Sequence, residues 1–345
     1  MILVRNLRLA PEQPLDALRG PAAKKLRIPE REIKELKLVK RSLDARKKSD
    51  IHYVCAVAAA LHGDEQKAIA HAKSADVSEY AEPVYDIPHV AAPEKRPVIV
   101  GFGPAGMFAA LVLARAGARP IVLERGMDAV SRKKAVDALR DGGGLQPESN
   151  VQFGEGGAGT FSDGKLNTGT KDRRMGWMLR EFAAHGAPES VIYDAKPHIG
   201  TDILIDVVQS IRREVIALGG EVRFGHRLER LNFACGRLTG AVVHCAENEY
   251  ALPCERLILA IGHSARDTFE NLNAQGVPMQ PKPFSMGVRI EHLQKNIDLA
   301  QYGRERGDLP AADYSLNVHL PDGTSAYTFC MCPPHQSRAA LSPTA

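Results

Sequence analysis

The sequence predicts an α/β protein made of more than one domain. Its 345 residues are enough to form two or more hydrophobic cores. Residues 97–125 read as a strand, a glycine turn, an Ala-rich helix and a second strand that ends in an acid. A further helix pattern and several strand patterns follow between residues 200 and 264. Strands that alternate with helices in this way are typical of a parallel sheet.

Residues 1–90 are expected to form a small α+β domain of their own. Residues 2–9 and 33–43 alternate like strands, 51–61 form a strongly apolar run, and 14–26 and 64–72 read as helices. Residues 74–97 are rich in proline and acids, so we interpret them as a connector.

The first 48 residues are basic, with 14 Lys and Arg against 6 Asp and Glu. A basic excess of this kind is one mark of an RNA-binding surface. No RNA motif and no row of stacking aromatics accompanies it, however, which favours a solvated basic face. The chain as a whole carries a net charge of only +4.

The glycine turn has the GxGxxG spacing of a dinucleotide-binding site. Gly101 permits the tight turn, Gly103 lets the backbone approach a pyrophosphate, and Gly106 allows the helix to pack closely on the sheet. The alternative is an ordinary strand–turn–helix in which the glycines serve only close packing and no ligand binds. The complete context, with an apolar strand before the turn and Gly117 after the helix, favours dinucleotide binding.

The start of the helix and the end of the second strand complete this expected site. Pro104 and Ala105 open the helix, whose unpaired N–H groups suit an anion. Glu124 stands where a carboxylate accepts hydrogen bonds from ribose hydroxyls, and Arg125 follows it.

A second glycine-rich stretch, residues 150–170, is expected to be a binding loop. Residues 154–159 also fit GxGxxG, but no helix pattern follows them, so we interpret them as loop. A flexible linker is the alternative, and the apolar residues Phe153, Phe161 and Leu166 argue against it. The loop residues expected to contact a cofactor are Gly157, Gly159 and Thr160, with Ser162, Asn167 and Thr168 as further polar partners.

Regular structure is predicted to return after residue 200. Thr201 or Asp202 is expected to cap a helix over residues 203–218, and a strand is predicted to start at Glu221. Residues 238–245 suggest a strand pair, and residues 255–262 suggest a buried strand that ends at Gly262.

The order of these elements resembles the flavoprotein fold of the glutathione-reductase type. In that family a late strand ends in a glycine that packs against the cofactor, and Ala260-Ile261-Gly262 stands in place of its Ala-Thr-Gly. Leu123-Glu124-Arg125-Gly126 is more similar to the FAD version of the acid-bearing turn than to the NAD version. The resemblance therefore implies a Rossmann-type FAD-binding domain, over residues 93–263.

Longer motifs at residues 153–166, 198–202, 282–292 and 329–333 are similar to a family of bacterial FAD-dependent dehydrogenases of unassigned substrate. This resemblance implies a cytoplasmic protein that holds one FAD and oxidises or reduces an unidentified small molecule, with NADH or NADPH as an optional transient donor. A non-catalytic dinucleotide sensor or scaffold, and a flavoprotein recruited to RNA by its basic domain, remain the alternatives.

The glutathione-reductase type of fold normally completes its cofactor site with a C-terminal return that carries a Gly-Asp pair. No such element follows here, and residues 264–345 read as a partial second domain with an atypical tail. The resemblance therefore implies an incomplete site at the ring end of the flavin.

The sequence does not single out catalytic residues. His198, His292, Lys165 and Arg289 are candidates for proton transfer or anion binding near a flavin, and Cys330 and Cys332 are expected to be core residues rather than a redox pair. No zinc-like spacing, signal peptide or ~20-residue apolar run is present, so we expect a metal-free, reduced cytoplasmic protein that does not cross a membrane.

Overall fold

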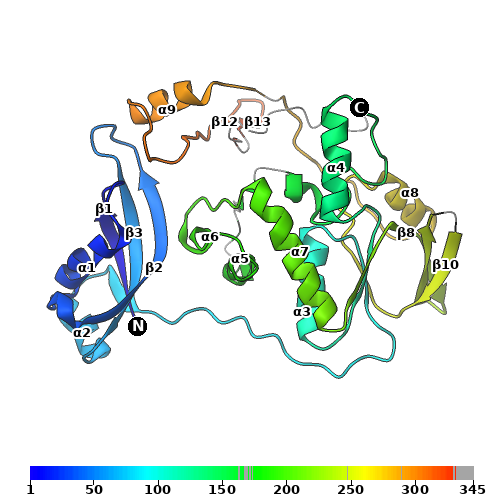
Figure 1. The fold of residues 1–345 in the computed structure, drawn as a ribbon, viewed down its shortest axis with the longest axis horizontal. Coiled ribbons are helices and arrows are strands. Elements are labelled where there is room, and N and C mark those ends of the chain that lie inside the picture. Colours follow the sequence, from blue (N-terminus) through cyan, green and yellow to red (C-terminus); the bar gives the residue numbers. More distant parts are fainter. Residues whose placement is uncertain are drawn as a thin grey trace.

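The computed structural model describes residues 1–161, 164–166, 170, 172, 174–246, 248–288, 290–328 and 331, without the side chain of Thr201. Figure 1 shows an N-terminal domain on the left, a larger α/β domain on the right, and C-terminal elements that lie above both. In the described part of the chain, no helix is long and apolar enough to cross a membrane.

The N-terminal domain has the element order βαββαβ and an antiparallel sheet with strand order β2-β3-β1-β4, which is the ferredoxin-like arrangement. One face of the sheet packs on both helices around Val4, Leu26 and Val57. Its elements are β1 (Ile2–Leu9), η1 (Leu15–Leu18), α1 (Arg19–Leu26), η2 (Glu30–Glu32), β2 (Ile33–Asp44), β3 (His52–Leu61), α2 (Glu65–Ala72) and β4 (Val77–Glu79). The predicted connector therefore begins later than expected, because β4 pairs with the edge of β1.

The central sheet is parallel, with the order β11-β5-β6-β7, and forms a Rossmann-type α/β fold that resembles FAD-binding domains. Alternate residues of β5 and β6 point to opposite faces. Ile99 and Val122 pack under helices, whereas Val100 and Leu123 pack under a three-stranded antiparallel sheet. The elements are β5 (Val98–Val100), α3 (Pro104–Arg115), β6 (Ile121–Glu124), α7 (Thr201–Ala217), β7 (Glu221–Phe224) and β11 (Leu257–Leu259).

Three sequence-based expectations need correction in this domain. Residues 238–245 lie in one strand, not two, because β9 (Arg237–Cys245) pairs with β8 (His226–Ala234) on one side and β10 (Asn248–Pro253) on the other. Helix α7 starts two residues early, with Gly200 at its N-cap in a left-handed conformation (φ 91°). Strand β11 is half exposed rather than buried, because it is an edge strand and Leu259 faces an open cavity.

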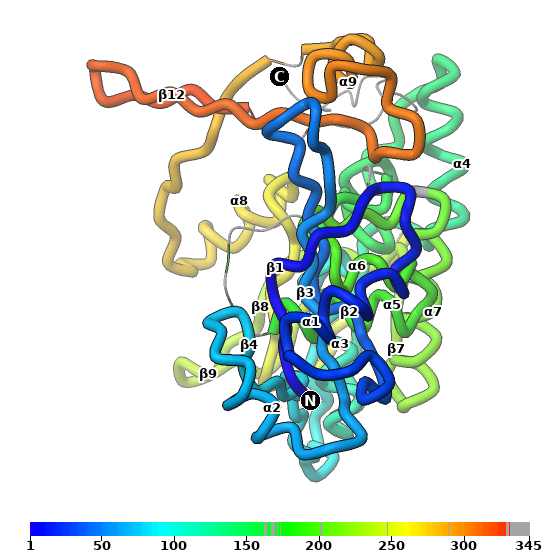
Figure 2. Tube along the Cα trace, turned by 90° about the vertical axis from the view of Figure 1, so that its left-hand side faces the viewer, coloured from blue at the N-terminus to red at the C-terminus, as the bar shows by residue number. Residues whose placement is uncertain are grey.

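The remaining helices connect these sheets. They are α4 (Ala129–Arg140), η3 (Gly157–Phe161), α5 (Arg174–Ala184), α6 (Ser190–Tyr193), α8 (Arg266–Ala274) and α9 (Gln294–Tyr302), and the chain forms a small hairpin of β12 (Asn317–His319) and β13 (Ser325–Tyr327). Figure 2 shows α9 beside the far end of the β2–β3 hairpin. Ile51 at that end packs with Tyr302 and Leu309, so the C-terminal part rests on the N-terminal domain.

The N-terminal domain is joined to the α/β domain at the edge of β2. Arg41 donates two hydrogen bonds to the carboxylate of Asp194, at 2.7 and 3.0 Å, and its guanidinium lies about 5 Å from the rings of Tyr53 and Tyr193. The backbone N–H of Ala195 donates to the carbonyl of Arg41 at 2.9 Å. These contacts extend the N-terminal sheet by a short piece of the other domain.

Candidate dinucleotide-binding site

Two glycines of the turn are required by the fold itself. Gly101 has a φ of +98°, and a Cβ on it would lie 2.4 Å from the carbonyl oxygen of Ala260. A Cβ on Gly106 would lie 1.9 Å from the carbonyl oxygen of Gly101. Both positions therefore exclude any larger residue, because the obstructing atoms are backbone.

Gly103 differs from these two, because the space around it is open. A Cβ at this position would meet only Gly157, at an ordinary contact distance of 3.6 Å. Gly103 is the N-cap of α3, with ordinary extended dihedrals. The protein alone does not explain a glycine here, whereas a ligand group lying against the backbone does.

The N-terminus of α3 offers donors to such a group. Pro104 occupies the first helical position and has no N–H, so Ala105 and Gly106 carry the first amides of the helix, and these have no intrahelical acceptor. Together with the positive end of the helix dipole, they suit a phosphate oxygen.

Glu124 is buried, with 4% of its surface exposed, and it holds three loops together. Its Oε2 accepts the backbone N–H of Phe102 at 2.7 Å, and its Oε1 accepts those of Gly126 at 2.9 Å and Gly154 at 3.0 Å. A carboxylate has about four acceptor positions, so about one remains for a ribose hydroxyl. The sequence predicted the ribose contact and missed the loop-tying role.

A cavity of about 680 Å³ opens above the turn, between β5, β6, β11, β8 and α8. This volume lies within the usual range for ligand pockets, about 300–1,000 Å³. Nine of the eleven residues predicted to bind the cofactor line it, namely Gly101, Gly103, Pro104, Ala105, Glu124, Arg125, Gly157, Gly159 and Gly262. Gly106 and Thr160 do not, since Gly106 packs under the turn and the buried Thr160 hydroxyl donates to the carbonyl of Glu155.

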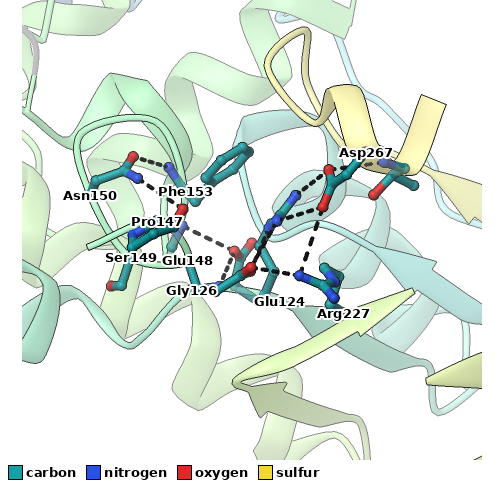
Figure 3. A network of polar contacts seen from close by, with 12 residues as sticks. Glu124, Gly126, Pro147, Glu148, Ser149, Asn150, Phe153, Arg227 and Asp267 are labelled. Carbon is teal, nitrogen blue, oxygen red and sulfur yellow. Dashed lines mark hydrogen bonds and ion pairs between the residues drawn. The ribbon is translucent and has the colours of Figure 1, made fainter. Parts of the chain in front are cut away.

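Arg125 lines the cavity and takes part in a charged network, of which Figure 3 labels Glu148, Arg227 and Asp267. Its guanidinium lies 4.3 Å from the ring centroid of Phe153 and binds Glu148 at 2.8 Å and Asp267 at 2.9 Å. Arg227 of β8 also binds Glu148, at 2.6 Å. The network thus joins β6, the glycine loop, β8 and α8. Burial disfavours the Asp267 carboxylate, but the hydrogen bonds and positive charge of Arg125, the backbone N–H of Thr268 and the charge of Arg227 together lower the pKa of Asp267.

Several lining residues were not anticipated from the sequence. His226, Leu228, Phe269 and Met279 lie on β8, on α8 and just after it, and the last three add apolar surface to the cavity wall. Their place depends on β8 and α8 folding back over β6, which no local pattern signals. The buried Arg132, which contacts the glycine loop, was also missed. The sequence offers one indication that Arg132 is buried: it stands three residues after Ala129 and four before Val136, on the face of α4 that these two buried residues share.

The described residues that were candidates for proton transfer or anion binding lie outside the cavity. His198 is exposed, and Lys165 and His198 form an isolated antiparallel backbone bridge. His292 is exposed too, and its Nε2 lies 2.8 Å from the hydroxyl of Tyr314. None of these three residues lines the cavity. Ser162, Asn167, Thr168, Arg289, Cys330 and Cys332 lie outside the described residues. Among those described, no group of three or more His, Cys, Asp or Glu side chains is placed to hold a metal.

The fold and the turn define an α/β protein with a Rossmann-type domain that resembles FAD-binding domains. Residues 95–138 match the family model described as an FAD binding domain, and residues 283–336 match the one described as an FAD-dependent protein, C-terminal domain-like. Residues 1–60 match a domain of unknown function.

An uncharacterized protein from Clostridium beijerinckii is 44% identical over 339 residues, which are 96% of this chain and 62% of that protein. The chain thus spans less than two thirds of the length of this relative.

Two solved structures are similar over about half of the chain. Thermovibrio ammonificans THI4 has a TM-score of 0.36 and 16% identity, over 53% of this chain and 64% of that one. Glycerol-3-phosphate dehydrogenase from Bacillus halodurans complexed with FAD has a TM-score of 0.32 and 12% identity, over 49% and 34%. No statement about substrate follows from these similarities.

Proposed function

We propose that the protein is an FAD-dependent oxidoreductase of a small-molecule substrate, reduced by NADH or NADPH. The observation that carries the proposal is the open space over Gly103, next to the N-terminus of α3 and opposite Glu124. A pyrophosphate fits the amide of Ala105 at the positive end of α3, and a ribose fits the remaining acceptor position of Glu124.

The chain's residues would bind and orient the cofactor. The apolar surface of Leu228, Phe269 and Met279 suits an adenine ring. Leu259 of the half-exposed β11, Gly262 and His263 also line the cavity. When bound, FAD supplies hydride acceptance and donation, so the protein need only position the substrate and exclude water.

An RNA partner gains no support from the N-terminal sheet. On the face away from the helices, one cross-strand row consists of Leu3, Ala58 and Lys37, and another of Arg8, Val54 and Ser42. RNA-binding domains of this arrangement use aromatic side chains on that face to stack bases. Neither row contains one.

The test is reduction of bound flavin. Purified protein is loaded with FAD, desalted and mixed anaerobically with NADH or NADPH. The visible absorption band of the oxidised flavin is followed. Loss of the absorption band supports the proposal. Bound flavin that neither donor reduces contradicts this choice of electron donor and favours a sensor or scaffold.

A further inference from the structure

One buried side chain holds the glycine loop in place from behind. Arg132 of α4 has no exposed surface. Its guanidinium donates to four backbone carbonyls of the loop, those of Asn150, Val151 and Glu155 at 2.7 Å each and that of Gly154 at 3.3 Å. It also lies 4.7 Å from the ring centroid of Phe161. No other side chain type presents five donors in a fixed planar fork, so these carbonyls are arranged around an arginine.

Burying the Arg132 guanidinium costs desolvation free energy, so contacts within the folded protein must compensate for it. Desolvation lowers the pKa of Arg132 to about 10, although the nearby carboxylates of Glu124 and Glu155 oppose the change. Within the described part of the chain, its hydrogen bonds go to these backbone carbonyls and not to a carboxylate. The four carbonyls that accept its hydrogen bonds converge on the guanidinium only when the loop is folded. The loop and Arg132 therefore stabilise each other.

The front of the same loop faces the phosphate-binding turn. The N–H of Gly154 donates to Glu124, and the N–H of Gly156 donates to the carbonyl of Phe102 at 2.8 Å. A Cβ on Gly157 would lie only 3.0 Å from the Cα of Gly103. A small shift of the loop would thus close or widen the space over Gly103 that the proposed function assigns to a pyrophosphate.

We propose that Arg132 is a positioning residue for the dinucleotide site. By fixing the carbonyls of residues 150–155, it sets the distance between the glycine loop and the turn at Gly103, and thereby the affinity for FAD. This inference rests on the proposed function. It assigns no ligand contact to Arg132, which lies behind the loop and does not line the cavity.

The test compares Arg132→Met and Arg132→Lys with a matched control, Arg115→Met. Arg115 is also partly buried in this domain, but it pairs with Glu181 and Glu214 on α5 and α7, away from the loop. Three quantities are measured: the FAD dissociation constant, the melting temperature without ligand, and the hydrogen exchange of loop amides without ligand.

We expect Arg132→Met to raise the FAD dissociation constant by roughly tenfold or more, equivalent to about 1.4 kcal/mol. Arg132→Lys, which keeps the charge but not the fork, should fall between it and the parent protein. The amides of Gly154 and Gly156 should exchange faster in Arg132→Met. Arg115→Met should lower the melting temperature and leave both the dissociation constant and these two amides unchanged.

The inference is overturned if Arg132→Met binds FAD as the parent protein does, or if Arg115→Met weakens binding equally. It is also overturned if neither Arg132 variant folds, because Arg132 would then determine the fold as a whole. If the parent protein itself does not bind FAD, the proposed function fails instead, while the exchange of Gly154 and Gly156 still reports whether Arg132 holds the loop.

Discussion

The carboxylate of Glu124 accepts the backbone N–H of Gly154 at 3.0 Å, across 30 residues of sequence. This bond joins the end of β6 to the glycine loop, and the same carboxylate reaches Phe102 in the turn. The proposed cofactor site is therefore built around one buried acid. Its geometry depends on charge-assisted hydrogen bonds that are about twice as strong as neutral ones.

Glu124→Gln should weaken the apo protein as well as the site. All three partners of the carboxylate are donors, so the amide nitrogen of Gln would face an N–H group. We expect a loss of about 1.5–3 kcal/mol in the free energy of unfolding, the value of one hydrogen bond to a charged group. Urea denaturation without ligand measures it. Unchanged stability would show that Glu124 does not tie the loops.

Gly103→Val should abolish FAD binding and preserve the fold. The added side chain would occupy the space proposed for the pyrophosphate, and its Cβ meets protein atoms only at ordinary contact distances. We expect the dissociation constant for FAD to rise at least roughly a hundredfold, or about 2.8 kcal/mol.

Two glycines serve as controls for that variant. Gly106→Val should fail to fold stably, because its Cβ would overlap the carbonyl of Gly101. Gly144→Val should leave folding and binding unchanged, because a Cβ there meets nothing within 4 Å. Melting curves and fluorescence titration with FAD distinguish the three. Equal FAD affinity in Gly103→Val and Gly144→Val would refute the assignment of the turn.

Acid should weaken the contact between α3, α5 and α7. Hydrogen bonds from Arg115, and then from His185, lower the pKa of Glu214. A carboxyl group with a lowered pKa in the folded state stabilises the protein above its unfolded pKa of about 4.3, and this contribution is lost as the pH falls through the folded value.

Glu214→Gln tests this pH dependence. The variant should be less stable than the parent protein at pH 7 by roughly 1–2 kcal/mol, between the values for exposed and buried ion pairs. The difference should shrink as the pH is lowered from 6 toward about 3. A difference that stays constant over this range would mean that Glu214 does not titrate with folding.

Arg41→Met should loosen the N-terminal domain without affecting the cofactor site. The variant loses both hydrogen bonds to Asp194 and the contacts with Tyr53 and Tyr193. We expect a cost of about 1–2 kcal/mol. Limited proteolysis should then cleave the 80–97 segment faster, while the FAD dissociation constant stays the same. Unchanged cleavage would show that Arg41 does not hold the two domains together.

The sequence predicted those features that depend on local spacing. The positions of Gly101, Gly103 and Gly106 indicated the strand–turn–helix, and β-branched residues before the turn indicated the parallel strand. The exposure of β11 was not predictable in this way, because an apolar run reads the same at the edge of a sheet as in its centre.

Most features of the site that the sequence did not predict depend on contacts between residues far apart in the chain. Arg125 meets Asp267 across 142 residues, and Arg132 is buried only because distant loop carbonyls converge on it. A charged residue on a helix normally indicates a solvated position. The spacing of Arg132 from Ala129 and Val136 is consistent with burial, but the carbonyls that accept its hydrogen bonds are visible only in the folded structure.

The most direct test of the account is to identify the small molecule that the protein retains. The parent protein and Gly103→Val are each incubated with FAD, desalted and denatured, and the released compound is analysed by mass spectrometry. We predict close to one FAD per chain from the parent protein and almost none from Gly103→Val. No FAD from the parent protein, or equal amounts from both, would contradict the assignment of the cavity to this cofactor.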